Sequence, residues 1–140
     1  IGMRFECRKL GDYNIINDAY NASPMSMEAS LSTLHQVTVT KGKRAIAVLG
    51  DMLELGHVAV AAHRKVGQQA AEDGASCVIT LGEMGREIAA GAKEAGLKQV
   101  YACDTHQQAA DRLKALLKPG DTVLFKGSRG MAMEKIIDLI

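Results

Sequence analysis

The chain has 140 residues, a formal net charge of +1, 24% charged residues and only 4% aromatic residues. This length fits one domain with a sizeable hydrophobic core. A near-neutral charge provides no field that favours nucleic acid or an anionic membrane, and the few aromatic side chains leave little material for stacking on bases. The apolar residues occur in short runs, and none approaches the roughly 18 residues that a membrane span requires.

The amino-terminal residues and the cysteines give a first indication of the compartment. The stretch IGMRFECRKL lacks the charged-then-apolar pattern of a signal peptide. Cys7, Cys77 and Cys103 are odd in number and far apart, which indicates buried thiols in a reducing cytosol. No pairing of histidines with cysteines or carboxylates has the spacing of a zinc site. We therefore expect a cytoplasmic protein without a disulfide framework or a metal centre.

The first elements are a hairpin and a helix. Two extended segments, 3–10 and 13–16, are joined by Gly11-Asp12, which is typical of a two-residue hairpin turn. A helix is predicted from Pro24 to Val37, because apolar residues recur on one of its faces. Ser23 is a suitable N-cap, and proline at the first helical position costs no hydrogen bond.

The rest of the chain alternates strands with helices. Strands are predicted at 44–49, 76–81, 99–103 and 122–125, and helices at 58–73, 83–95, 105–117 and 131–140. Thr105 and Gln108 have the spacing of a capping box. Strands separated by single helices imply right-handed crossovers and a parallel sheet. The sequence therefore predicts one three-layer α/β domain, Rossmann-like, with a mostly parallel six-stranded sheet, an N-terminal antiparallel hairpin strand and helices on both faces.

Three of the strand-to-helix loops are rich in polar residues: NDAYNASP, GDMLELGH and KGSRGM. Ligands of open α/β sheets bind at the carboxyl ends of the strands, so these loops are expected to form one site. The chain has no G-x-G-x-x-G after its first parallel strand, no G-x-x-x-x-G-K-[ST] and no G-x-S-x-G. It therefore lacks a phosphate loop and a nucleophile elbow, and it does not look like a self-sufficient enzyme.

The combination DAYNASPMSM, AVLGDMLELG and VLFKGSRGMAMEKI, in this order, resembles the C-terminal domain of the Mur ligases over the whole chain. The resemblance implies a three-domain protein in which the first domain binds a UDP-sugar and the central domain carries the ATP phosphate loop. Only the third domain corresponds to residues 1–140, so we expect this chain to be inactive in isolation. The implied reaction is ATP-dependent peptide ligation through an acyl phosphate in peptidoglycan precursor synthesis, with Mg²⁺.

Within the family, DAYNASP together with KGSR favours the member that joins D-alanyl-D-alanine to UDP-N-acetylmuramoyl-tripeptide. Two alternatives stay open. One is the corresponding domain of a sister ligase, either another Mur ligase or one of the folylpolyglutamate synthetase type. The other is a non-catalytic, receiver-like binding module, which Asp18, Asp51 and Lys126 loosely resemble. For the ligase we expect a monomer that binds neither nucleic acid nor membrane.

The resemblance assigns Asp18, Tyr20 and Asn21 to the nucleotide, with Asp18 directed at the ATP ribose. A carboxylate can accept from both ribose hydroxyls, which suits this role. The alternative for Asp18 is a turn-stabilising residue, and Asn21 could equally lock the loop by bonding its backbone. The family usually has NANP where this chain has NASP, so Ser23 puts any ligand contact of the second asparagine in doubt.

The D-alanyl-D-alanine carboxylate is expected on the KGSRG loop, with Arg129 as the main partner and Ser128 and Lys126 nearby, at the amino end of the last helix. The alternative for Arg129 is an ion pair with Glu134. Asp51 could hold the ammonium of the dipeptide or favour a helix amino terminus, and for Glu54 the second reading is preferred. His63 is more often a packing or capping residue, and the apolar stretch 58–62 is unexplained. Met131 and Met133 are expected in the core.

Overall fold

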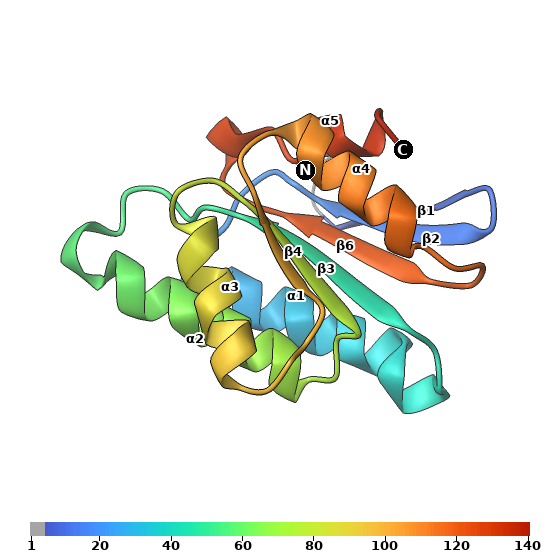
Figure 1. Ribbon diagram of the computed structural model, residues 1–140, viewed down its shortest axis with the longest axis horizontal. Coiled ribbons are helices and arrows are strands. Elements are labelled where there is room, and N and C mark those ends of the chain that lie inside the picture. Colours follow the sequence, from blue (N-terminus) through green and yellow to red (C-terminus); the bar gives the residue numbers. More distant parts are fainter. Residues whose placement is uncertain (1–4) are drawn as a thin grey trace.

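The computed structural model describes residues 5–140 as a six-stranded sheet with helices on both faces (Figure 1). The elements are β1 (Glu6–Leu10), β2 (Tyr13–Asp18), α1 (Pro24–Val37), η1 (Val39–Lys41), β3 (Ala45–Gly50), η2 (Gly56–Val58), α2 (Ala59–Glu72), β4 (Cys77–Leu81), α3 (Gly85–Glu94), β5 (Val100–Cys103), α4 (His106–Leu116), β6 (Thr122–Lys126), η3 (Arg129–Met131) and α5 (Glu134–Ile137). The strand order is β1-β2-β6-β3-β4-β5.

The predicted hairpin and fold class are confirmed. Strands β1 and β2 are antiparallel with Leu10 opposite Tyr13, and Gly11 between them has a φ of 60°, a left-handed conformation that favours glycine. The other neighbouring strands are parallel. Residues 3 and 4 of the predicted first strand lie outside the described residues.

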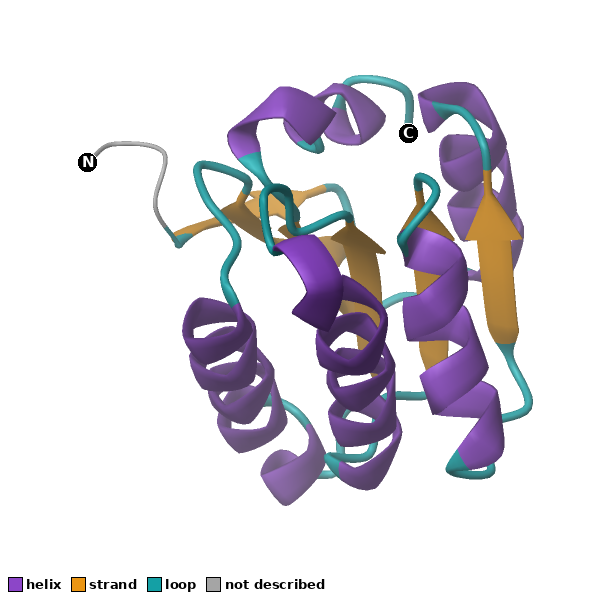
Figure 2. Ribbon diagram, turned by 90° about the vertical axis from the view of Figure 1, so that its left-hand side faces the viewer, coloured by secondary structure: helices purple, strands orange, loops and turns teal. Residues whose placement is uncertain are grey.

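The sheet separates two apolar cores, because successive residues of a strand point to opposite faces. One face packs against α1, α2 and α3, which lie beside one another in Figure 2, and its buried strand residues include Ile16, Ala47 and Leu124. The other face packs against α4 and α5 and includes Ile15, Val48 and Phe125. With both faces covered, β3, β4 and β6 are buried along their whole length, as their continuous apolar sequences indicate.

Both predicted N-caps are present, and one capping box is complete. Ser23 Oγ accepts from the Ser26 amide at 3.1 Å, and Ser26 Oγ accepts from the Ser23 amide at 2.9 Å. Thr105 Oγ1 accepts from the Gln108 amide at 3.1 Å, but Gln108 Oε1 accepts from the Asp104 amide instead of that of Thr105. The second box is therefore half formed, and its glutamine caps one residue earlier than predicted.

The helix predicted at 131–140 is not formed as a single element. The chain makes the short 3-10 turn η3, then Ala132 takes a left-handed conformation with a φ of 48°, and only Glu134–Ile137 is helical. The break turns Met133 inward, where it is 0% exposed, while Ile136 and Ile137 pack in the same core. The apolar spacing correctly predicted buried side chains, but the backbone between them is not a continuous helix.

The cysteines divide differently from the prediction. Cys77 and Cys103 are buried, and burial raises the pKa of both thiols, so they are held in the protonated form. Cys7 is exposed on the edge strand β1, so the prediction that all three are buried is wrong for this residue. Four consecutive residues of β1 are exposed, so neither face of this edge strand is covered as the central strands are, which a single-sequence pattern does not reveal.

Candidate functional site

The three polar loops lie side by side because the strands before them are neighbours. Strands β2, β6 and β3 are adjacent and parallel, so their carboxyl ends share one edge of the sheet. The loops that follow them, 19–23, 127–133 and 51–58, therefore form one continuous surface. The two plain loops follow β4 and β5, farther along the same sheet.

Ser128 ties the β6 loop to the β3 loop. Its amide donates to the Asp51 carbonyl at 2.9 Å, and its Oγ accepts from the Leu53 amide at 2.8 Å. The side chain is buried at 8% exposure. Because Oγ is an acceptor in this contact, the hydroxyl hydrogen remains directed elsewhere and can be donated. Sequence reasoning selected Ser128 as a ligand contact but missed this bridge between loops.

Two glycines bring the same loops into close contact. A Cβ on Gly127 would lie 2.8 Å from Met133 Cγ and 3.1 Å from Gly50 Cα, and a Cβ on Gly50 would lie 2.6 Å from Met133 Sδ. Glycines in a ligand-binding loop such as KGSRG commonly allow close approach of the backbone to a ligand. In the structure, the absent side chain of Gly127 makes room for Met133 and for the end of β3.

Asp51 caps a helix, although not the helix that follows it directly. Its Oδ1 accepts from the Gly85 amide at 2.8 Å, at the first residue of α3. The carboxylate is 7% exposed and lies against Gly82, where a Cβ would come 2.5 Å from Oδ1. The helix-terminus reading of Asp51 is therefore confirmed for α3. The cap uses Oδ1, so the other oxygen, Oδ2, can accept from a ligand.

His63 is a packing and capping residue, as preferred from the sequence. It is 0% exposed, its Nε2 accepts from the Met52 amide at 2.9 Å, and its Nδ1 lies 2.6 Å from the Ala59 carbonyl. An acceptor nitrogen cannot carry a proton, so the ring is neutral with the proton on Nδ1. His63 thereby fixes the β3 loop to the first turn of α2.

Arg129 and Glu134 form an ion pair, which was the alternative that the sequence left open. The two side chains are 41% and 29% exposed, so the guanidinium still reaches the surface. Arg129 belongs to η3, a three-residue turn, so the long helix expected to present amide donors behind it is absent. The ion pair with Glu134 also restricts the orientation of the Arg129 guanidinium.

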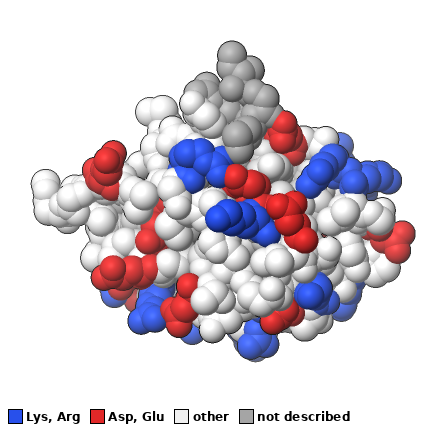
Figure 3. Space-filling model, turned by 90° about the horizontal axis from the view of Figure 1, so that it is seen from above, with Lys and Arg blue, Asp and Glu red and all other residues white. Residues whose placement is uncertain are grey.

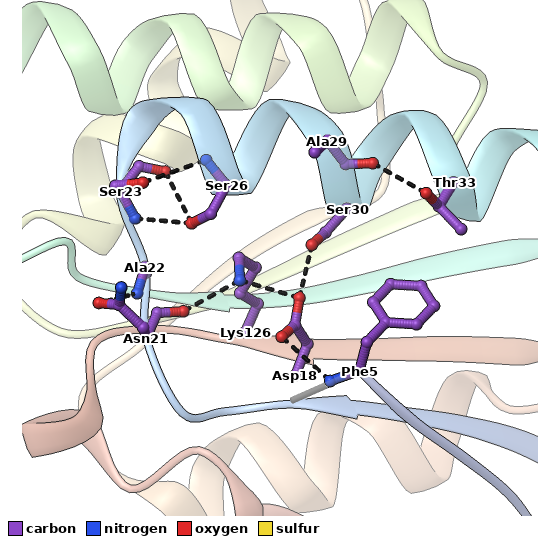
Figure 4. A network of polar contacts seen from close by, with 10 residues as sticks. All are labelled: Phe5, Asp18, Asn21, Ala22, Ser23, Ser26, Ala29, Ser30, Thr33 and Lys126. Atoms are coloured by element: carbon purple, nitrogen blue, oxygen red, sulfur yellow. Dashed lines mark hydrogen bonds and ion pairs between the residues drawn. The ribbon is translucent and has the colours of Figure 1, made fainter. Parts of the chain in front are cut away.

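Asp18 and Lys126 lie together at the ends of the neighbouring strands β2 and β6 (Figure 4). Lys126 Nζ is 2.8 Å from Asp18 Oδ2, and the side chains are 3% and 10% exposed. The structure therefore places Lys126 with the residues expected at the nucleotide. Ser128 and Arg129, which were expected beside it, come two and three residues later and turn toward the β3 loop and Glu134.

Tyr20 and Asn21 are at the surface of the same edge. Tyr20 is 37% exposed, and Asn21 Oδ1 accepts from the Ala22 amide at 2.8 Å, so this amide side chain does bond its own loop. Four large apolar residues of the loops and helix starts are also exposed: Met25, Leu53, Val58 and Val60. Val58 and Val60 belong to the apolar stretch at 58–62, for which the sequence alone offers no explanation.

On the face seen in Figure 3, acidic and basic side chains are interspersed, so no patch of one charge marks it out. Among residues 5–140, no group of three or more His, Cys, Asp or Glu side chains is arranged to hold a metal ion. No helix within that range is both long and apolar enough to cross a membrane.

The fold and the three loops define an open α/β domain of the kind that binds ligands at the carboxyl ends of its strands. The family profile "Mur ligase, glutamate ligase domain" matches residues 3–129. The chain therefore belongs to the Mur ligase family and corresponds to its C-terminal domain.

Its relatives are similar over nearly the whole chain. The UDP-N-acetylmuramoyl-tripeptide–D-alanyl-D-alanine ligase of Bacillus subtilis is 42% identical over 99% of this chain, and that of Mycobacterium tuberculosis H37Rv is 35% identical over 98%. The crystal structure of MurF ligase from Thermotoga maritima in complex with ADP has a TM-score of 0.82 at 26% identity, covering 98% of this chain and 30% of that one. The chain spans 31% of the length of the Bacillus subtilis relative and 30% of the mycobacterial one.

Proposed function

We propose that this chain is the C-terminal, substrate- and nucleotide-positioning domain of an ATP-dependent ligase that joins D-alanyl-D-alanine to UDP-N-acetylmuramoyl-tripeptide in peptidoglycan precursor synthesis. The observation that carries the proposal is the 42% identity to the Bacillus subtilis ligase of that name, across 99% of the chain. The three polar loops at one sheet edge support it, because they provide a site without a phosphate loop.

The remaining parts of the reaction belong to a UDP-sugar domain and a central ATPase domain of the whole protein. A carboxylate of the tripeptide attacks the γ-phosphorus of ATP, giving an acyl phosphate and ADP. The dipeptide amine, after losing a proton, attacks the acyl carbon, an amide bond forms and phosphate leaves. We place the Mg²⁺ of the reaction mainly on the central domain, where it would neutralise charge on the nucleotide phosphates. We place this protein in the cytoplasm as a monomer.

At the nucleotide, we assign Asp18 to a ribose hydroxyl and Tyr20 and Asn21 to the edge of the nucleotide. Tyr20 is 37% exposed and follows β2 by two residues, which places it at the edge of the sheet where ligands of this fold bind. Asn21 Oδ1 is used within the loop, so its contribution to a ligand comes from the Nδ2 donors. Asp18 is mostly enclosed, which limits it to a single ligand contact.

At the dipeptide, we assign Arg129 to the carboxylate, Ser128 to a supporting hydrogen bond and Asp51 Oδ2 to the ammonium. A planar guanidinium can grip a carboxylate through two parallel hydrogen bonds and so fix its orientation. The 41% exposure of the Arg129 side chain, which is also paired with Glu134, supports this assignment. Lys126 was expected in the same group, but its ammonium is turned toward Asp18.

The full-length protein tests these assignments in a ligation assay with separate titrations of ATP and dipeptide. Arg129→Lys keeps the charge but loses the fork, so the KM for the dipeptide should rise on the order of tenfold with the KM for ATP unchanged. The isolated 140-residue chain should show no ligation or ATP hydrolysis. Wild-type dipeptide kinetics in the lysine variant would return Arg129 to a purely structural ion pair, and absence of ligation by the full-length protein would reject the proposed function.

A further inference from the structure

The contacts of Lys126 are internal and specific. Its Nζ donates to Asp18 Oδ2 at 2.8 Å and to the Asn21 carbonyl at 3.0 Å, and the side chain is only 3% exposed. Figure 4 shows the ammonium between these two acceptors, below the start of α1. An ammonium has three donors, and two of them are used here. A buried lysine with these contacts is poorly placed to reach a dipeptide at the surface.

Asp18 is held from three directions. Ser30 Oγ on α1 donates to Oδ2 at 2.5 Å, Lys126 bonds the same oxygen, and the Phe5 amide lies 3.3 Å from Oδ1. An ionised carboxylate has about four acceptor positions, so these contacts leave about one, on Oδ1. The long Phe5 contact is the weakest of the three. The carboxylate is therefore fixed in direction, with its remaining capacity on the oxygen that points away from Lys126.

The loop between β2 and α1 is held in its middle and at the end where α1 begins. Lys126 bonds the carbonyl of Asn21 in the middle of the loop, and the capping box of Ser23 and Ser26 fixes the point where α1 begins. Asn21 Oδ1 accepts from the next amide and adds a local restraint. All of these contacts are made by groups of the protein itself, and a loop fixed by its own contacts loses less conformational freedom when a ligand binds, which favours affinity.

We propose that Lys126, with Ser30, is a positioning residue for the nucleotide: its ammonium orients the Asp18 carboxylate and fixes the Asn21 carbonyl, and it makes no contact with the dipeptide. This inference rests on the proposed function and assigns Lys126 to the other substrate of that site. Replacing a buried ion pair by apolar residues is often neutral for stability, so stability alone gives little reason for an ammonium here. Orientation of a ligand acceptor does give one.

The test uses the full-length protein and three variants: Lys126→Met, Ser30→Ala and, as a matched control, Arg44→Met. Arg44 forms the ion pair with Asp121 at the amino ends of the strands, away from the loops. The KM values for ATP and for D-alanyl-D-alanine are measured separately, together with binding of ADP alone and the Tm of each variant.

We expect Lys126→Met to raise the KM for ATP and the Kd for ADP about tenfold or more, because an acceptor loses its charge-assisted support. Ser30→Ala keeps both charges and should raise the same two constants severalfold. In both variants the KM for the dipeptide should stay within about twofold of the wild-type value, because neither side chain contacts the dipeptide. Arg44→Met should lower the Tm and leave all three constants unchanged.

A rise in the dipeptide KM with an unchanged ATP KM in Lys126→Met would overturn the inference and make Lys126 a dipeptide ligand. If Lys126→Met does not fold, Ser30→Ala decides, and a wild-type ATP KM there would equally overturn it. If Arg44→Met and Ser30→Ala raised the KM for ATP equally, the inference would also be overturned. The contacts among Lys126, Asp18 and Ser30 would then contribute only to stability. Failure of the proposed function is distinct, since the wild-type protein itself would then form no dipeptide-extended product.

Discussion

The two ends of the sheet each contain a buried carboxylate paired with a cation, in different surroundings. At the amino ends of the strands, Asp121 is 1% exposed and accepts from Arg44 Nε at 2.9 Å, from Arg44 Nη2 at 3.2 Å and from the Lys118 amide at 2.8 Å. At the carboxyl ends, Asp18 is 7% exposed and accepts from Lys126, Ser30 and the Phe5 amide.

The difference lies in what each cation holds besides its carboxylate. Arg44 also donates to the carbonyl of Leu116, the last residue of α4. This ion pair therefore joins the starts of β3 and β6 to the end of α4. Lys126 also donates to the carbonyl of Asn21, which belongs to a polar surface loop. Two similar ion pairs thus restrain different segments, the end of α4 in one case and a polar surface loop in the other. A role in ligand binding is indicated by the segment that the cation restrains, because the ion pair alone is common to both ends.

The largest expected effect is on the enclosed pair at the carboxyl ends. Lys126→Met leaves Asp18 without its cation, and removing one partner of a buried pair costs about 3–5 kcal/mol of unfolding free energy. Urea unfolding of the purified protein measures this loss. The double variant Asp18→Asn/Lys126→Met should regain part of it, since no unpaired charge remains. A loss of only about 0–1 kcal/mol, as for a surface pair, would contradict the burial argument.

The pair at the amino ends should be less sensitive. Arg44 is 31% exposed, and Asp121 keeps the Lys118 amide when Arg44 is replaced. Arg44→Met is therefore expected to lower the free energy of unfolding by about 1–3 kcal/mol, the cost of leaving a buried acceptor partly unsatisfied. The same urea titration measures it. A loss equal to that of Lys126→Met would remove the distinction between the two ends.

Asp51 tests whether every buried acid at the carboxyl ends serves the site. Asn at this position keeps an oxygen for the Gly85 amide, and asparagine caps helices as well as aspartate does, so the stability of Asp51→Asn should change by less than about 0.5 kcal/mol. If Oδ2 holds the dipeptide ammonium, the dipeptide KM should rise about tenfold through the lost charge. An unchanged dipeptide KM would leave Asp51 as the cap of α3 only.

The smallest effect is expected at the edge strand β1. Its exposed residue Cys7 belongs to neither ion pair. The exposed Cys7 should react with a thiol reagent at pH 8, while Cys77 and Cys103 react only slowly, because burial raises their pKa and blocks access. Mass spectrometry of the labelled protein identifies the site. Modification of Cys7 should alter neither the free energy of unfolding nor the two KM values, and equal labelling of all three thiols would show that the sheet edges open readily.

Much of the fold could be predicted from local patterns. The bounds of α1, its N-cap and the hairpin turn at Gly11 depend on residues close in sequence, and these predictions are confirmed. The prediction of a helix at 131–140 was wrong because the apolar spacing there indicates which side chains are buried and not the backbone conformation between them. Ala132 is left-handed, and the next residue, Met133, is fully buried. The prediction that Cys7 is buried was wrong for a related reason, because the exposure of its side chain depends on which strand lies at the edge of the sheet.

The candidate site was predicted in composition and only partly in arrangement. The three polar loops were selected from their residues, and their shared edge followed from the rule for parallel strands. The pairing of Arg129 with Glu134 was an open alternative, and the bridge from Ser128 to Leu53 was missed because no short motif encodes a contact between residues 75 apart in sequence.

The sequence by itself determined the alternation of strands and helices, the turns, the caps and the residues available for chemistry, because these depend on near neighbours and on periodicity. The tertiary structure alone decided that β6 lies between β2 and β3. Backbone hydrogen bonds between parallel strands are the same for any residue, so strand order is set by how the helices pack on the two faces. That order brings Lys126 to Asp18, 108 residues away, and turns a lysine expected at the dipeptide toward the loop between β2 and α1.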